Sequence, residues 1–145
     1  MDYARDDNMG RFSVDVELAS YEDLALVRRG VMSPEQVRRL TVRGFVDTGA
    51  ATLVVPERVA RQLDLPVTGQ TRVRYADGRR ADREMVGGIY LTYGGRSDVF
   101  SAIVEPDRDS ALIGAIVLEA LDLIPDCRNQ VLTPRDPHQI LSEIE

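Results

Sequence analysis

Lysine is absent from this sequence of 145 residues, and all 18 of its basic side chains are arginines. A Schiff-base enzyme and a P-loop nucleotide hydrolase each need a lysine, so the sequence excludes both classes. The single cysteine, Cys127, excludes an internal disulfide and a metal site built from cysteines alone. The single histidine, His138, likewise excludes a metal site built from several histidines.

The histidine is also poorly placed for nucleophilic catalysis. A Ser-His-Asp or Cys-His enzyme would have to use His138, which lies in a tail that contains Pro134 and Pro137. Nucleophile and base must be held rigidly within hydrogen-bond reach of each other, and such a tail does not provide this. Carboxylate chemistry remains, and the sequence predicts neither a metal site nor a cofactor.

Long apolar segments are missing as well. No run approaches the ~18 apolar residues of a membrane-spanning helix. The charged residues 1–7 lack the apolar centre of a signal peptide. The net charge of −6 disfavours nucleic acid, because that binding is driven by positive charge. We therefore expect one cytoplasmic domain that binds neither membranes nor nucleic acid.

One carboxylate stands out among the features that are present. Asp47 follows an apolar run at residues 40–46 and begins an Asp-Thr-Gly-Ala stretch, after which a second apolar run covers residues 53–55. Gly49 lets the backbone adopt φ > 0 and brings main-chain N–H groups near the carboxylate. The stretch predicts a carboxylate held at the end of a strand. Taken alone, it also fits an ordinary turn between two strands, because Asp and Gly are favoured turn residues.

A second motif follows further along the chain. Residues 111–114 read Ala-Leu-Ile-Gly, and an apolar helical pattern occupies residues 115–121. In this order and spacing, the two motifs resemble the signatures of retropepsin-like aspartic proteases of the bacterial single-domain type. The resemblance covers residues 40–133, with residues 11–19 as the first strand. It implies a mostly β fold, a closed retropepsin-like β-barrel with one short helix after the Leu-Ile-Gly motif and a helical insertion after the first strand.

Sequence periodicity places the elements of this fold. Residues 11–19 alternate between apolar and polar side chains, as a half-buried strand does. Residues 20–39 predict two short helices, each begun by a serine cap, and minimal members of the family have a short turn here instead. The other expected elements are strands at 40–46, 71–75, 79–86, 86–93, 97–104, 111–113 and 128–133, helices at 56–63 and 115–123, and two-residue hairpin turns at Asp77-Gly78 and Gly94-Gly95.

The chain is expected to have three parts. Residues 1–10 are polar and predict a flexible N-terminus. Residues 11–133 form the single retropepsin-like aspartic protease domain, with residues 20–39 as its helical insertion. Residues 134–145 form an acidic tail with apolar residues at helical spacing, which predicts a fraying helix or a weak docking segment.

The resemblance implies an aspartic endopeptidase, a hydrolase that cuts peptide bonds with a water activated by two aspartates. The chain contains one Asp-Thr-Gly, and neither Asp77 nor Ser110 begins a second copy. The second carboxylate is therefore expected from another copy of the chain in a two-fold symmetric homodimer. The expected catalytic residues are Asp47, with Asp47 of the partner subunit, Thr48 and Gly49.

The resemblance also implies a groove for a peptide or protein substrate, bound as an added strand. The charged hairpin around Asp77-Gly78 corresponds to the flap, which closes over substrate in the family. At Ala51 and Ala115 the viral members commonly carry a paired Asp and Arg, so a polar contact to the peptide main chain is lost here. The expected substrate-binding residues are Phe45, Ala50, Ala51, Val54, Tyr75, Ala76, Asp77, Gly78 and Leu112.

Two other functions fit parts of the sequence. A non-cleaving retropepsin-like homodimer could bind extended peptides, although a pure binder gains nothing from a desolvated carboxylate pair. A small β-barrel interaction domain with a fortuitous Asp-Thr-Gly predicts no dimer with Asp47 on its axis. Turnover of a peptide library distinguishes the first from a protease, and the geometry of the dimer distinguishes the second.

Overall fold

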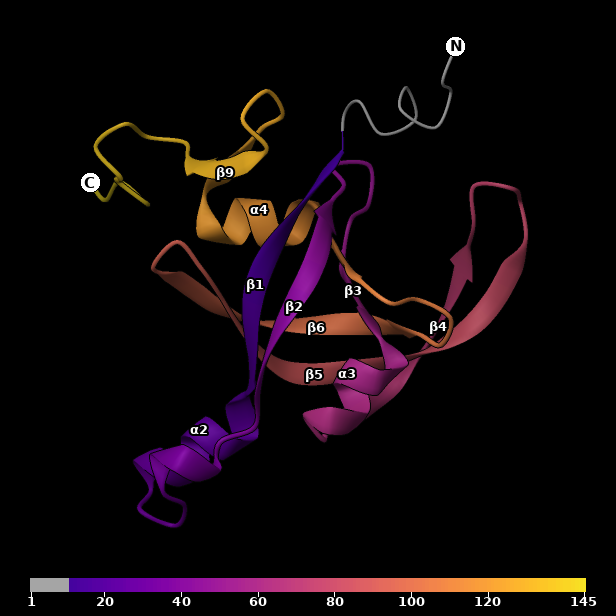
Figure 1. The fold of residues 1–145 in the computed structure, drawn as a ribbon, viewed down its shortest axis with the longest axis vertical. Helices are drawn as coiled ribbons and strands as arrows, with labels where there is room; N and C mark the ends of the chain where they lie inside the picture. Colours follow the sequence, from indigo (N-terminus) through magenta and orange to yellow (C-terminus); the bar gives the residue numbers. More distant parts are fainter. Residues whose placement is uncertain (1–10) are drawn as a thin grey trace.

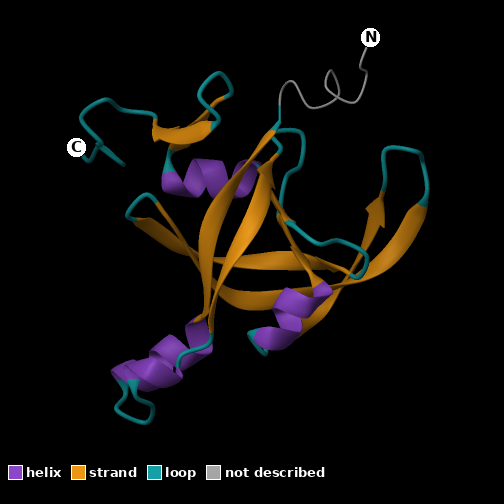
Figure 2. Cartoon of the chain, viewed as in Figure 1, coloured by secondary structure: helices purple, strands orange, loops and turns teal. Residues whose placement is uncertain are grey.

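The computed structural model describes residues 11–145, and one continuous sheet forms most of it (Figure 1). Its strands follow the order β1-β2-β7-β3-β6-β5-β4, and an additional pairing of β1 with β5 closes all of them except β4 into a barrel. The mostly β, closed-barrel fold predicted from the sequence is confirmed (Figure 2). The expectation for residues 1–10 lies outside the described residues.

The strands of this sheet are β1 (Phe12–Ser20), β2 (Arg39–Val46), β3 (Leu53–Pro56), β4 (Val67–Arg74), β5 (Arg80–Tyr93), β6 (Arg96–Glu105) and β7 (Ala111–Ile113). The helical elements are α2 (Tyr21–Arg28), the 3₁₀ helix η1 (Pro34–Gln36), α3 (Glu57–Gln62) and α4 (Ala115–Leu121), and a separate two-stranded sheet joins β8 (Leu123–Asp126) to β9 (Val131–Pro134). No helix in the described part of the chain is long and apolar enough to cross a membrane.

The first two strands lead the chain to Asp47. β1 and β2 pair antiparallel, from Phe12 opposite Val46 to Ala19 opposite Arg39. The apolar residues of the alternating pattern in β1 are buried, as the sequence predicts. The interior that they help to fill contains, as its largest fully buried side chains, Leu18, Leu53, Leu63, Ile89, Leu91, Ile113 and Leu121. β2 therefore ends, next to Asp47, against a well-packed core.

The insertion between β1 and β2 contains one α-helix where the sequence predicts two. The Ser20 hydroxyl accepts from the Asp23 N–H at 3.2 Å and begins α2, as expected. The second cap, Ser33, forms its capping box with Gln36, but only η1 follows. The physical reason is Val37, which is buried in extended backbone, so the chain enters β2 after a single turn.

The turn between β5 and β6 matches its prediction. Gly94 and Gly95 have φ angles of 58° and 80°, as both central residues of a type I′ turn must. β5 is one strand of 14 residues, where the sequence predicts two that meet at Val86. A bulge between Val86 and Ile89 bends this strand, so its first half pairs with β4 and its second half with β1.

The turn between β4 and β5 differs from its prediction. The Tyr75 N–H donates to the Arg79 carbonyl, and the Gly78 N–H donates to the Tyr75 carbonyl, so the loop is longer than two residues. Gly78 has a φ of 90°, whereas Asp77 has no positive φ. The physical reason lies in the Asp77 side chain, whose Oδ1 accepts from the Arg79 N–H at 2.9 Å and holds the longer turn.

The C-terminal elements follow the prediction only in part. Helix α4 begins at Ala115 as predicted but ends at Leu121, before the expected end at Leu123. β8 was not expected, and β9 begins later than the predicted strand at 128–133. Asp122 causes the difference, because its left-handed backbone, with φ of 53°, ends the helix and turns the chain into β8. Residues 134–145 contain no helix. The tail contacts the sheet through a hydrogen bond in which Arg96 Nη2 donates to the Gln139 carbonyl at 3.1 Å.

Candidate active site

Asp47 stands where the chain leaves β2 for the loop that leads to β3. Its N–H donates to the Ile113 carbonyl at 3.0 Å, which extends the pairing of β2 with β7. The Gly49 N–H donates to Asp47 Oδ1 at 3.0 Å, and the Ala50 N–H donates to the Asp47 carbonyl at 3.1 Å. Both the main chain and the half-buried carboxylate of Asp47 are therefore held in place.

β7 and the start of α4 brace this loop. β7 lies between β2 and β3, parallel to β2 and antiparallel to β3. The Ala115 N–H donates to the Ala50 carbonyl at 2.8 Å, and the Ile116 N–H donates to the Ala51 carbonyl at 3.0 Å. A Cβ at Gly114 would lie 2.7 Å from the Ala50 oxygen, so this close approach requires glycine. The two motifs of the sequence are thus joined into one rigid unit.

The apex of the loop faces solvent. Thr48 and Gly49 are exposed next to the half-buried Asp47. Within residues 11–145, no hydrogen bond forms at the Thr48 hydroxyl. The predicted catalytic residues therefore lie together at a surface that another molecule can reach.

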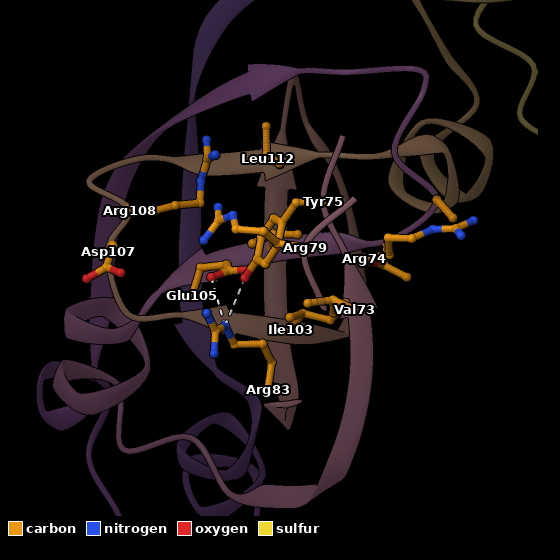
Figure 3. A pocket seen from close by; sticks show the side chains of 13 residues that line it. Val73, Arg74, Tyr75, Arg79, Arg83, Ile103, Glu105, Asp107, Arg108 and Leu112 are labelled. Carbon is orange, nitrogen blue, oxygen red and sulfur yellow. Dashed lines mark hydrogen bonds and ion pairs between the residues drawn. The ribbon is translucent and has the colours of Figure 1, made fainter. Parts of the chain in front are cut away.

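A cavity of about 560 Å³ borders the loop (Figure 3). Four of the predicted substrate-binding residues line it: Ala51, Val54, Tyr75 and Leu112. The other five predicted residues do not line the cavity. Phe45 lies under the Arg11 guanidinium, and Ala50 is hydrogen-bonded within the loop. Ala76, Asp77 and Gly78 are exposed at the hairpin turn. Residues that the sequence did not single out complete the lining: Thr52, Val73, Arg74, Arg79, Arg83, Ile103, Glu105, Asp107 and Arg108.

A family model described as aspartyl protease matches residues 35–117, which is more than half of the chain and includes both motifs. The chain belongs to this aspartyl protease family.

Solved structures with some similarity to this chain include two viral proteases. EIAV protease complexed with the inhibitor HBY-793 is 18% identical with a TM-score of 0.47, and the match covers 55% of this chain and 75% of that chain. The solution structure of simian foamy virus (mac) protease is 14% identical with a TM-score of 0.47, and the match covers 73% of this chain and 90% of that chain. No curated protein matches the sequence.

One wall of the cavity is a hydrogen-bonded charge cluster. The Tyr75 hydroxyl donates to Glu105 Oε2 at 2.6 Å, and Arg83 Nε donates to Glu105 Oε1 at 3.0 Å and to the Tyr75 hydroxyl at 3.1 Å. The bond to Glu105 raises the pKa of Tyr75 above its ordinary value, and the bond to the same carboxylate raises the pKa of Arg83. The cluster joins the end of β4 to the end of β6 and keeps Tyr75 neutral.

The turn of the β4–β5 hairpin carries a second, more exposed charge pair. Arg79 Nε donates to Asp77 Oδ2 at 2.8 Å, and the Arg79 guanidinium lies 4.9 Å from the centre of the Tyr75 ring. The hydrogen bonds from the Arg79 backbone and side chain lower the pKa of Asp77 below its ordinary range. Arg79 thus connects the turn to the cluster beneath it.

Arg108 contributes a different kind of charge to the cavity. It lies in the connection between β6 and β7, and it donates from Nε to the Ser110 carbonyl at 3.0 Å and from Nη2 to the Ser110 hydroxyl at 3.3 Å. Burial lowers the pKa of Arg108, and the Arg11 charge lowers it further, whereas Glu105 and Asp47 act in the opposite direction. Arg108 is therefore a partly desolvated cation at the cavity.

Proposed function

We propose that this chain is an aspartic endopeptidase, and that a homodimer forms its active site from Asp47 and Asp47 of the partner subunit. The observation that carries the proposal is the braced Asp-Thr-Gly loop with its exposed apex. Hydrolysis by an aspartic dyad needs two carboxylates around one water. The chain has one such loop, so a second copy is the natural source of the other carboxylate.

The proposed reaction uses one proton shared by the pair, because two carboxylates about 3 Å apart do not both ionise. The ionised Asp47 takes a proton from water, and the water oxygen bonds to the scissile carbonyl carbon. The protonated Asp47 gives its proton to the carbonyl oxygen and so neutralises the charge that develops there. In the second half, the amide nitrogen takes a proton from one Asp47, a hydroxyl of the tetrahedral intermediate returns a proton to the other, the carbon–nitrogen bond breaks, and acid and amine products leave.

The β4–β5 hairpin is the proposed flap. Val73, Arg74, Tyr75 and Arg79 bring its strand ends and turn to the cavity, opposite the loop residues Ala51 and Thr52. An extended peptide between the two would satisfy its main-chain groups as an added strand does. The proposal therefore assigns substrate binding to the cavity and leaves the exposed tip, residues 76–78, for closure over the bound peptide.

A peptide-library assay across acid and neutral pH, with wild type and Asp47→Asn, tests this proposal. We expect cleavage by wild type in a bell-shaped pH profile, no cleavage by Asp47→Asn, and an unchanged fold in the variant. Cleavage by Asp47→Asn would contradict the mechanism. If neither protein cuts but both bind peptides, the non-cleaving peptide binder is the better description.

A mixing experiment tests the shared site. When wild type and Asp47→Asn subunits exchange at equal concentrations, random pairing places half of the wild-type chains in mixed dimers with one carboxylate. Activity per wild-type chain should then fall by about half. Unchanged activity under conditions of demonstrated subunit exchange would show that one Asp47 suffices, and an active monomer in sedimentation would exclude the dimer.

A further inference from the structure

The charged residues that line the cavity are mostly positive, whereas the molecule as a whole is negative. The chain as a whole has a net charge of −6. The cavity, however, is lined by Arg74, Arg79, Arg83 and Arg108 against only Glu105 and Asp107. A cleft that has low-dielectric walls and is lined by charges of one sign concentrates the electric field of those charges. It therefore attracts ligands of the opposite sign.

The cavity carboxylate that could neutralise these arginines is already engaged. Both oxygens of Glu105 are used, one by Tyr75 and the other by Arg83, and the Glu105 side chain is only 14% exposed. Arg79 is paired with Asp77 at the turn. The Glu105 cluster and the Asp77 pair are therefore complete without a ligand.

Arg108 is not neutralised in the same way. Within residues 11–145 no carboxylate forms an ion pair with its guanidinium, and its hydrogen-bond acceptors are the uncharged carbonyl and hydroxyl of Ser110. The adjacent Asp107 and Arg108 side chains leave their turn in different directions, and the Arg108 guanidinium lies toward Leu112 (Figure 3). A half-buried cation without an ion-pair partner gains when an anion reaches it.

The geometry points to Arg108 as a specificity residue that binds the carboxylate of an acidic substrate side chain near the cleaved bond. The apolar surfaces of Val54, Ile103 and Leu112 would contact the methylene groups of that side chain, and Arg108 would receive its charge. The volume of about 560 Å³ is in the range of ligand sites. The inference rests on the proposed protease function for its place next to the cleaved bond, but acid recognition itself is measurable without cleavage.

The cleavage arm compares matched peptides. Peptides cut by wild type are remade with Glu, Gln or Leu at each position flanking the cleaved bond. At one position we expect wild type to prefer Glu over Gln by roughly tenfold in kcat/KM. Arg108→Gln should abolish this preference while it still cuts the Gln peptide, and Arg108→Lys should retain part of it because a point charge remains. The matched control is Arg28→Gln, since Arg28 is an exposed arginine on α2 outside the cavity lining.

The binding arm separates this inference from the proposed function. An array of peptides with Glu, Gln or Leu at each position is probed with Asp47→Asn and with the double variant Asp47→Asn/Arg108→Gln. Acid-dependent binding that the second substitution removes supports the inference even if wild type cuts nothing. Cleavage or binding with no preference for Glu, or a Glu preference unchanged in Arg108→Gln, overturns it while the protease function stands. Absence of both peptide binding and cleavage overturns both, and a thermal melt of each variant checks the fold.

Discussion

The Asp47 loop and the β4–β5 hairpin border the same cavity, but different forces hold them. The loop is fixed by main-chain hydrogen bonds to β7 and α4 and by the close contact at Gly114. The hairpin is held beside its turn by the Tyr75–Glu105–Arg83 cluster and at the turn itself by an exposed ion pair. Catalytic groups need fixed positions, whereas a cover over substrate must open at low cost. The two regions therefore suit a rigid floor and an adjustable cover.

The largest effect is expected from a side chain at Gly114. In Gly114→Ala the new Cβ meets the Ala50 and Thr52 carbonyl oxygens, and backbone cannot move aside as a flexible side chain can. We expect a loss of about 3 kcal/mol in the free energy of unfolding and a loss of peptide cleavage. The matched control is Gly69→Ala in β4, where nothing lies within 4 Å of an added Cβ. Equal stability of the two variants in denaturant melts would contradict the account of a braced loop.

A smaller effect is expected at the hairpin turn. Gly78 has a φ of 90° and open space around it, so Gly78→Val strains the backbone without a collision. We expect a cost of about 2 kcal/mol in hairpin formation, because a β-branched residue disfavours this conformation. Turnover should fall more than global stability, since the turn can open while the barrel stays folded. A global destabilisation as large as that of Gly114→Ala, in the same melts, would show that the two regions are not separate.

The Tyr75–Glu105–Arg83 cluster beside the turn should contribute still less to stability. Tyr75→Phe keeps the ring and removes the hydroxyl that donates to Glu105 Oε2. We expect a loss of about 1 kcal/mol, since the acceptor is charged but partly hydrated. Hydrogen exchange should rise in β4 and the first half of β5 and stay unchanged in β2. In a Glu105→Gln background the same substitution should have a smaller effect, and equal effects in the two backgrounds would refute the coupling.

The smallest effect is expected on acidification. Arg79 holds the pKa of Asp77 below its ordinary value, so ionised Asp77 stabilises the turn above pH ~4. This stabilisation is lost as the pH falls through the lowered folded-state value. Amide exchange at the turn, corrected for intrinsic rates, should therefore speed up between about pH 4 and pH 2. The Gly94-Gly95 turn serves as the internal control, and Asp77→Asn should remove the pH dependence. The same pH dependence in Asp77→Asn would refute this role.

The same comparison explains what the sequence could predict. The Asp47 loop and the Gly114 motif were found because each is a short contiguous pattern, and their pairing belongs to the family as a whole. The cavity wall was not found. Glu105 meets Arg83 only through the register of β5 on β6, in which Met85 lies opposite Ile103, and no local pattern states that register.

Local chemistry also explains two of the errors in the turns and ends of elements. Asp77-Gly78 and Gly94-Gly95 both favour two-residue turns by composition, but the Asp77 carboxylate holds a longer one by accepting from Arg79. β8 was missed because its first apolar residue, Leu123, continues the apolar pattern of α4. The helix ends because the backbone of Asp122 is left-handed. Asp can adopt this conformation, but an Asp in the sequence does not predict it.

The position of β7 between β2 and β3 affects the order in which the strands of the sheet can pair during folding. β2 and β3 are neighbours in sequence, but each pairs with β7, which the chain supplies only after β4, β5 and β6. The Asp47 loop therefore closes through contacts between distant segments, which form late and slowly in folding. A chain emerging from the ribosome would have the Asp-Thr-Gly sequence long before it had a rigid Asp-Thr-Gly loop. The Asp47 loop therefore reaches its braced form only after β7 has joined the sheet.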